Sequence, residues 1–486
     1  MKLPIKTNIS YAAAGMTVLV IFFLTIFCQW VNFSLIIPLL LLLVGLHLFF
    51  IKRASVRLFL QLGLLLALLM EATYATVYQM GASPLYVPVA SLVMLTMLLF
   101  NDLHLGFLMA VVSSILASLL ISPQAAGLSQ IDCLLIFLAG NLTAVYTIRD
   151  ARTRGHLIGS GFYVGIMMVV AIILLHPEIP FFMSKENVLV FVRPLILNGV
   201  ICSFFVLATL KIFEFLFGVL TNFSLLELSD FNQPLLKRMI LEAPGTYQHS
   251  LVVGNVAEAA ADAIGANSLL TRVGAYYHDI GKMEKPEYFT ENQLIGGNKH
   301  DRMEPSMSRL VILNHVKEGL ALAKKNKLNP MIADFIPQHH GTSLMHYFYQ
   351  KALEDSEDEK GVKEENYRYP GPKPQRPETA IVLLADSVEA ATRSLDEASP
   401  IKIEETVRKI INNKFIDGQL DECNLTLKEI ELIASTFTRI LGATYHGRVK
   451  YPEKKNESDN RNQKPAEDNP DSSRPDQNGR KKNPKA

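Results

Sequence analysis

The chain has 486 residues and a formal net charge of +1, but its charged side chains are unevenly distributed. Residues 1–220 hold 18 charged residues, about 8% of that stretch, whereas the other 266 residues hold 75, about 28%, close to the roughly 25% of an average soluble domain. This split excludes a single soluble globule and a chain lying wholly in the membrane. The lack of a basic excess argues against DNA or RNA polymers as partners.

The apolar stretches of residues 1–221 predict a multi-span membrane domain. A helix needs about 20 apolar residues to cross a hydrocarbon core of about 30 Å. We count about eight candidates, at 11–30, 33–51, 57–79, 85–100, 104–121, 132–148, 157–176 and 189–218. The first has no small-residue cleavage site before Trp30, so we expect a retained anchor and not a signal peptide.

The basic residues predict the orientation of these spans. Lys and Arg cluster before the first span, between the second and third, between the sixth and seventh, and after the eighth. Because such residues stay on the cytoplasmic side, we expect the N-terminus and the C-terminal half of the chain in the cytoplasm.

The remaining residues predict a second helical domain. We expect a linker at 222–234, where Ser229 or Asp230 can cap a helix and Pro234 suits a first turn. Residues 235–450 carry apolar positions at spacings of three and four with almost no alternating pattern, which indicates helix after helix. A charged and Pro-rich loop insertion is expected at 354–378, and a disordered tail at 451–486. The fold class is all-α throughout.

Seven of the twelve histidines fall between residues 249 and 346. The sharpest motif is His278-Asp279-Ile280-Gly281-Lys282, in which the imidazole and carboxylate can share one ion or the carboxylate can bridge two, and Gly281 lets the chain turn. Further candidate ligands are His249, His315, the pair His339 and His340, and Asp386. His300 and His346 do not fit the pattern, and we interpret them as structural.

These seven side chains are enough for two octahedral ions that keep positions for water. Imidazole and carboxylate ligands without thiolate favour iron, manganese or a similar divalent ion, and the four dispersed cysteines form no CxxC pair. A lone histidine is more often structural. That reading does not account for the motif, the His-His pair and an Asp within Leu383-Leu-Ala-Asp386 all together.

Five segments carry a resemblance to a known family: Leu241–His249, Val273–Met283, Gln338–Thr342, Tyr369–Gln375 and Leu384–Ala390. Together they resemble the seven-transmembrane HD phosphodiesterases of the PgpH type, over about residues 8–450. The resemblance implies a metal-dependent phosphodiesterase in the bacterial cell (inner) membrane, which hydrolyses the second messenger cyclic di-AMP to pApA.

The resemblance also implies roles for single residues. It makes His249, His278, Asp279 and Asp386 ligands of one metal, and it makes Asp279 a bridge to a second metal that His315, His339 and His340 complete. Asp279 and Lys282 are the expected catalytic residues. Lys282, Thr342 and Arg393 are the expected contacts to substrate.

One departure from the family and several alternatives remain. The family usually has a large extracellular domain after its first span, whereas here only a few residues near Trp30–Ser34 join the first two expected spans, so we expect that domain to be lacking. Base preference is not readable from the motifs, so an HD hydrolase of cyclic di-GMP stays open. A non-catalytic nucleotide-binding membrane receptor is a further alternative. Association of the chain into a homodimer also stays open.

Overall fold

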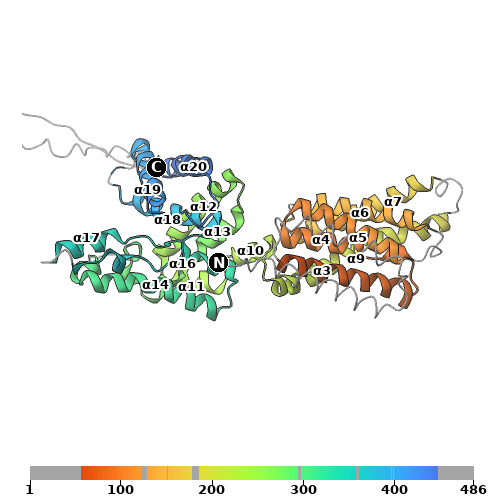
Figure 1. Ribbon diagram of the computed structural model, residues 1–486, viewed down its shortest axis with the longest axis horizontal. Helices are drawn as coiled ribbons and strands as arrows, with labels where there is room; N and C mark the ends of the chain where they lie inside the picture. Colours follow the sequence, from red (N-terminus) through yellow and green to blue (C-terminus); the bar gives the residue numbers. More distant parts are fainter. Residues whose placement is uncertain are drawn as a thin grey trace, which may run out of the picture.

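The computed structural model describes residues 56–121, 128–149, 151–177, 185–293, 297–356, 361–395, 397 and 399–446. Within these ranges every regular element is a helix, apart from an isolated antiparallel bridge between Leu344 and Arg368. The predicted all-α class is therefore confirmed. The expected spans 11–30 and 33–51, the connector between them and the expected tail lie outside the described residues. Figure 1 shows two helical bundles, joined through the short helix α10 (Asn222–Leu228).

One bundle consists of apolar helices and makes the chain a membrane protein. Of the helices in the described residues, five are long and apolar enough to cross a membrane, while the stretch Pro84–Phe100 is apolar but shorter. The predicted spans from 57–79 onward all coincide with helices. These are α3 (Val56–Tyr74, continued by a π-helix at Ala75–Gln79), α4 (Val89–Phe100), α5 (Leu103–Leu120), α6 (Gln130–Ile148), α7 (Arg154–Leu175) and α9 (Lys185–Phe217).

Small and polar residues hold these helices together. Where Gly161 of α7 crosses Gly199 of α9, a Cβ on Gly161 would lie 2.3 Å from the Gly199 carbonyl oxygen, so the two backbones are in close contact. Such contacts replace hydrophobic attraction, which a lipid environment does not supply. The buried Asn141 of α6 donates to the hydroxyls of Ser113 and Ser114 on α5, at 3.0 and 2.9 Å, which gives its amide partners inside the bundle.

The last membrane helix is anchored at the end that faces the second bundle. The carbonyl of Phe217 accepts hydrogen bonds from Gln61 Nε2, at 3.2 Å, and from Arg57 Nη2, both on α3. Gly218 follows with a φ of +60°, a left-handed turn that glycine adopts without strain. The chain therefore leaves α9 at a fixed point and in a fixed direction.

The expected linker contains the helix α10, whose first turn is held by α9. The buried Glu214 carboxylate of α9 accepts hydrogen bonds from the backbone N–H of Thr221, at 3.1 Å, from its hydroxyl, and from the Ser224 hydroxyl, at 2.7 Å. At the other end of α10, the carbonyl of Leu228 accepts a hydrogen bond of 2.9 Å from the Tyr277 hydroxyl in the second bundle. The segment is thus structured at both ends.

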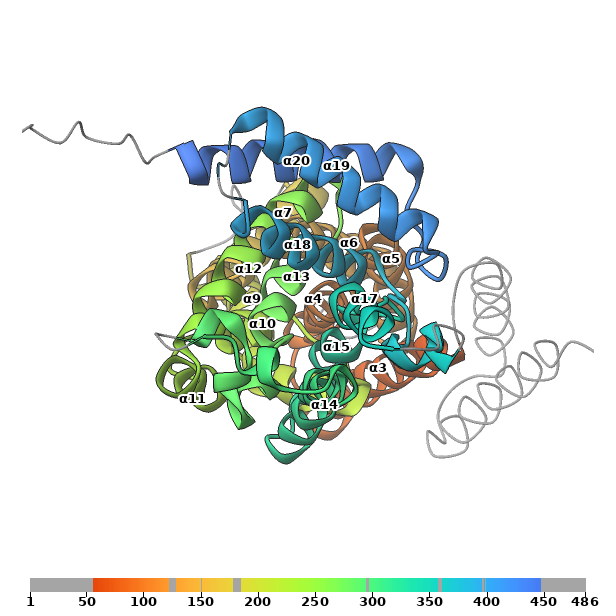
Figure 2. The same cartoon turned by 90° about the vertical axis from the view of Figure 1, so that its left-hand side faces the viewer.

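The second bundle is built around α12, α13 and α18. Their apolar faces share one buried core with α19 and α20. Figure 2 shows α18 and α13 lying between the pair α19–α20 and the helix α14. The helices are α11 (Pro234–Glu242), α12 (Pro244–Ile264), α13 (Ser268–Tyr277), α14 (Pro305–Lys325), α15 (Pro330–Ala333), α16 (Phe335–Gln338), α17 (His346–Glu354), α18 (Pro377–Arg393), α19 (Pro400–Ile416) and α20 (Leu427–His446).

Candidate metal centre

The His278-Asp279 pair lies where α13 gives way to a short 3-10 helix, Ile280–Glu284. Both side chains are buried, with Asp279 only 1% exposed. A Cβ on Gly281 would lie 1.8 Å from the carbonyl oxygen of His315. The φ of Gly281 is not positive, so glycine is needed here for close packing of α14 and not, as expected, to turn the chain. This packing brings His315 up to Asp279.

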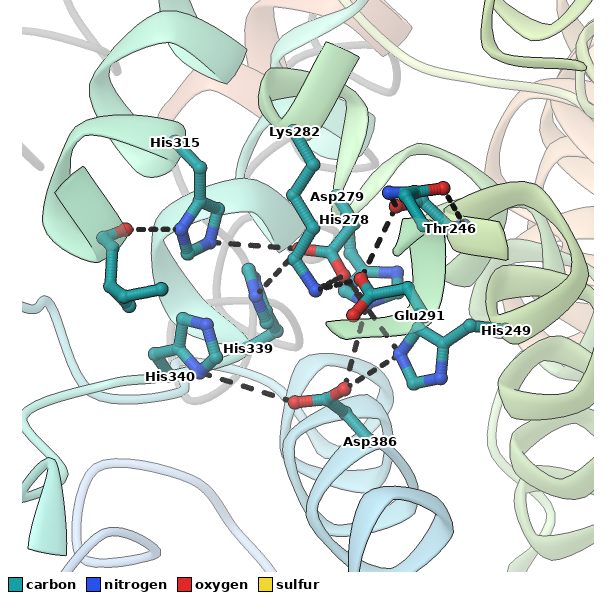
Figure 3. Close-up of polar contacts among 12 residues, drawn as sticks. Thr246, His249, His278, Asp279, Lys282, Glu291, His315, His339, His340 and Asp386 are labelled. Atoms are coloured by element: carbon teal, nitrogen blue, oxygen red, sulfur yellow. Dashed lines mark hydrogen bonds and ion pairs between the residues drawn. The ribbon is translucent and has the colours of Figure 1, made fainter. Parts of the chain in front are cut away.

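The side chains of all seven predicted ligands point toward one another from separate elements, as Figure 3 shows. They form two groups that share Asp279, and within each group one atom per residue lies within 4.8 Å of the others. One group contains His249, His278, Asp279 and Asp386; the other contains Asp279, His315, His339 and His340.

The two carboxylate oxygens of Asp279 face different groups. Oδ2 lies 3.1 Å from His278 Nε2 and 3.8 Å from His249 Nε2. Oδ1 lies 3.6 Å from His315 Nε2 and 3.4 Å from His339 Nε2. A carboxylate placed in this way can bind one ion with each oxygen.

The histidine rings are held from behind. The Nδ1 atom of His278 donates to the Ala275 carbonyl at 2.6 Å, that of His339 to the Phe335 carbonyl at 3.1 Å, and that of His315 to the Ile312 carbonyl. Because a carbonyl only accepts, each Nδ1 carries the hydrogen. In the neutral ring Nε2 then keeps its lone pair, which is the state that binds metal.

The donor atoms fit divalent cations. The Nε2 atoms of His278, His315 and His339 are buried and have no hydrogen-bond partner among the described residues. Buried polar atoms without partners are costly and rare, and here several converge on one carboxylate. Nitrogen and carboxylate donors about 3 Å apart suit an ion about 2.1 Å from each. The chemistry of the set therefore fits metal binding.

The charges of the site are balanced around its two aspartates. Burial raises the pKa of Asp279, but His278 and Lys282 outweigh it and bring the pKa well below its ordinary value. Burial would lower the pKa of His278, yet Asp279 and Asp386 raise it to about 10. Burial lowers the pKa of His315 to about 4. Protons and Lys282 thus offset the carboxylates, in positions where metal cations would do the same.

Lys282, predicted from its place in the motif, points into the centre. Its Nζ lies 2.7 Å from Asp279 Oδ2 and 2.9 Å from Glu291 Oε1. Burial lowers the pKa of Lys282, but these carboxylates outweigh it and the pKa is raised, so the amine stays protonated. The Thr246 hydroxyl donates to the same Glu291 oxygen at 3.2 Å.

Sequence reasoning missed three residues that touch the predicted ligands or Lys282. Glu389, 3% exposed, accepts from His249 Nδ1 at 2.6 Å. Glu291 binds Lys282, and the Tyr369 ring stacks on His340 with centroids 4.1 Å apart. Glu389 follows Asp386 by three residues, so helical spacing alone could have placed it on the same face. No comparable signal links Glu291 to the motif, whereas Tyr369 begins one of the five segments that carry the family resemblance but had no predicted role.

The two remaining predicted substrate contacts have protein partners. The backbone N–H of Thr342 donates to Gln419 Oε1 at 2.8 Å, and its hydroxyl accepts from Gln419 Nε2 at 2.9 Å. Arg393 Nη1 lies 3.3 Å from Glu389 Oε1. The structure thus places Thr342 in the loop after His340, and Arg393 behind the residue that orients His249.

Comparison with known proteins gives two matches that follow one another along the chain. A family model described as a 7TM receptor with intracellular HD hydrolase matches residues 10–221. A second, described as the HD domain, matches residues 246–391, which include all seven candidate ligands. The chain belongs to the family of 7TM receptors with an intracellular HD hydrolase.

Similar proteins in this family carry a stated activity. The chain is 44% identical over 321 residues to the cyclic-di-AMP phosphodiesterase PgpH of Listeria monocytogenes, which covers 66% of this chain and 44% of that protein. It is 39% identical over 372 residues to PgpH of Bacillus subtilis, covering 76% of this chain and 51% of that protein. The chain thus spans about half the length of these curated relatives.

A solved structure is also similar. The crystal structure of the L. monocytogenes PgpH HD domain in complex with cyclic-di-AMP is 52% identical. The match covers 45% of the present chain and the whole of the crystallised chain, with a TM-score of 0.43.

Proposed function

We propose that the chain is a membrane-anchored phosphodiesterase that hydrolyses cyclic di-AMP to the linear dinucleotide pApA. The observation that carries this proposal is the convergence of five imidazoles and two aspartates on one buried point, with Asp279 between the two groups. The substrate is inferred from the relatives named above as cyclic-di-AMP phosphodiesterases.

The donor set would hold two divalent ions, of which iron or manganese suits the nitrogen and carboxylate ligands best. Such ions offset the negative charge of a phosphodiester and generate a nucleophile from water at neutral pH. The residues of the chain provide the positioning: backbone carbonyls and Glu389 fix the rings, and Asp279 lies between the groups. The protonated Lys282 is placed to donate a hydrogen bond to a phosphate oxygen.

The reaction adds one water and breaks one bond between phosphorus and a 3′ oxygen, which leaves a 5′ phosphate and a free 3′ hydroxyl. The decisive experiment incubates the purified full chain with manganese and, separately, cyclic di-AMP, cyclic di-GMP and ppGpp. We expect cyclic di-AMP to give pApA at the highest rate, measured by chromatography. Faster turnover of cyclic di-GMP or ppGpp would replace the proposed substrate, and binding without cleavage would identify a receptor.

Two substitutions test the metal chemistry. Asp279→Ala removes the shared carboxylate and His339→Ala removes a nitrogen from one group, so each should lower hydrolysis by a factor of 100 or more. Helical content by circular dichroism should stay unchanged. His346→Ala, at the exposed start of α17, is the matched control and should keep full activity. Full activity in both site variants would contradict the mechanism.

We also propose that the second bundle lies in the cytoplasm of a bacterial cell, beneath the inner membrane. Arg57 contacts the end of α9 next to α10, and Arg154 lies 3.7 Å from Glu227 of α10. Basic residues of the membrane bundle therefore gather at the end that faces the second bundle, as expected for the cytoplasmic side. In a variant without its four native cysteines, labelling of one cysteine placed at the exposed Lys409 should need permeabilised cells. Labelling in intact cells would reverse the orientation.

A further inference from the structure

Four cations near the candidate metal centre are paired with carboxylates. The paired cations are Lys282 with Asp279 and Glu291, Arg368 with Glu364 and Asp417, Lys373 with Asp421, and Arg393 with Glu389. Lys414 of α19 has no carboxylate within ion-pair distance among the described residues. Its Nζ donates to the neutral hydroxyl of Ser343, at 2.7 Å.

Lys414 is attached to the loop that carries two predicted ligands. Ser343 is buried and follows His340 by three residues, and its neighbour Thr342 is bound by Gln419 from the turn after α19. Gly341, between His340 and Thr342, has a φ of +55°, and a Cβ on it would lie 2.5 Å from Gln419 Oε1. The loop is therefore clamped onto α19, and the Lys414 ammonium has a fixed position beside it.

The ammonium also lies within electrostatic reach of the centre. Burial lowers the pKa of Lys414, and the carboxylates of Asp386 and Asp417 act in the opposite direction. Among the described residues the one hydrogen-bond partner of this half-buried ammonium is a neutral hydroxyl. A charged group withdrawn from water without a counter-charge is costly. An anion brought by a ligand would supply it.

We propose that Lys414 binds the second phosphodiester of a cyclic dinucleotide, the one that is not being cleaved. This rests on the proposed function, in which the donor set and Lys282 hold the first phosphodiester. A cyclic dinucleotide carries two such anions on one ring, so a substrate placed in the centre presents a second charge to its walls. Lys414 makes the site selective for ligands with two phosphates over those with one.

The test compares two substrates that differ in the number of phosphodiesters. Full-length protein loaded with manganese is given cyclic di-AMP or bis(p-nitrophenyl) phosphate, which has one phosphodiester. Lys414→Met should raise KM for cyclic di-AMP about tenfold, as expected for a lost hydrogen bond to a charged group, and leave kcat/KM for the single diester within a factor of two. Lys409→Met, on the exposed side of α19, is the control and should change neither.

A binding measurement gives a readout that does not depend on turnover. A non-hydrolysable phosphorothioate analogue of cyclic di-AMP, titrated by calorimetry, should bind Lys414→Met about tenfold more weakly, and Lys414→Arg should recover most of the affinity. An equal loss on both substrates would indicate a structural role and overturn the proposal, as would unchanged KM and binding. If the unmodified protein cleaves only bis(p-nitrophenyl) phosphate and not cyclic di-AMP, the proposed function is wrong. That result differs from those that would overturn only the role of Lys414.

Discussion

At the scale of single residues, the centre is organised by groups that are not themselves candidate ligands. Glu389 accepts from Nδ1 of His249 and in turn contacts Arg393. A carboxylate behind a ligating imidazole fixes the ring and raises its basicity. The structure therefore gives Arg393 a positional role one step further from the centre.

This arrangement predicts the effect of removing Glu389. Glu389→Ala should weaken manganese binding 10- to 100-fold, the usual cost of losing such a partner, while Glu389→Gln should cost less because its amide oxygen still accepts from Nδ1. Competition against a fluorescent chelator measures the affinity. Glu405→Ala, on the exposed surface of α19, serves as control; an affinity equal to that control would show that His249 needs no orienting partner.

The candidate ligands were predictable because chemistry restricts them to few residue types. The motif of His278 and Asp279, the His339–His340 pair and an aspartate within an apolar helix each stand out in a chain with twelve histidines. The roles of Glu291 and Tyr369 did not stand out, because their contacts with Lys282 and His340 follow from tertiary packing and not from helical spacing. For Gly281 the sequence predicted that glycine was needed, but the reason, contact with the His315 backbone, depends on tertiary packing.

At the scale of elements, the helix positions followed well from apolar periodicity. The described residues between 235 and 446 form helix after helix as expected, and each expected span from 57–79 onward coincides with a helix. The segment 222–234 was expected only as a linker, yet it contains α10. A seven-residue helix has little intrinsic stability, and α10 depends on Glu214 at its start, a contact that periodicity does not reveal.

The crossing of α7 and α9 leads to a prediction about membrane packing. Gly199→Leu would place a side chain where the Gly161 carbonyl oxygen lies 2.0 Å from the Cβ position, so the two helices must separate. We expect the thermal unfolding temperature in detergent to fall by several degrees. Light scattering during heating measures this temperature. Gly159→Leu, on α7 and with no atom within 4 Å of its Cβ position, should be tolerated. Equal falls in both variants would refute the packing argument.

At the scale of the whole molecule, a hydrogen bond joins α10, the helix that follows the membrane bundle, to the residue before the metal motif. The Tyr277 hydroxyl binds the Leu228 carbonyl at the end of α10, and Tyr277 directly precedes His278. A cavity of about 760 Å³ borders both residues, together with Phe215 of α9 and Pro330 of α15. The contact between the bundles is therefore only partly packed at this point.

Tyr277→Phe should loosen this junction without emptying the metal centre. The Leu228 carbonyl loses its donor, which costs roughly 1 kcal/mol, so amide hydrogen exchange should speed up across residues 222–228. Metal content by mass spectrometry should stay the same. Tyr276→Phe is the control, because Tyr276 contacts Phe231 through its ring; exchange that is as slow in Tyr277→Phe as in the control would mean that the bond does not hold α10.

The same hydrogen bond bears on how the proposed activity is assayed. A soluble piece starting at Pro234 would lack the carbonyl that holds the Tyr277 phenol, one residue away from the imidazole of His278. Rates obtained from such a piece would describe a centre that lacks the hydrogen bond between Tyr277 and Leu228. Only protein that retains α9 and α10 would report the proposed chemistry with this hydrogen bond in place.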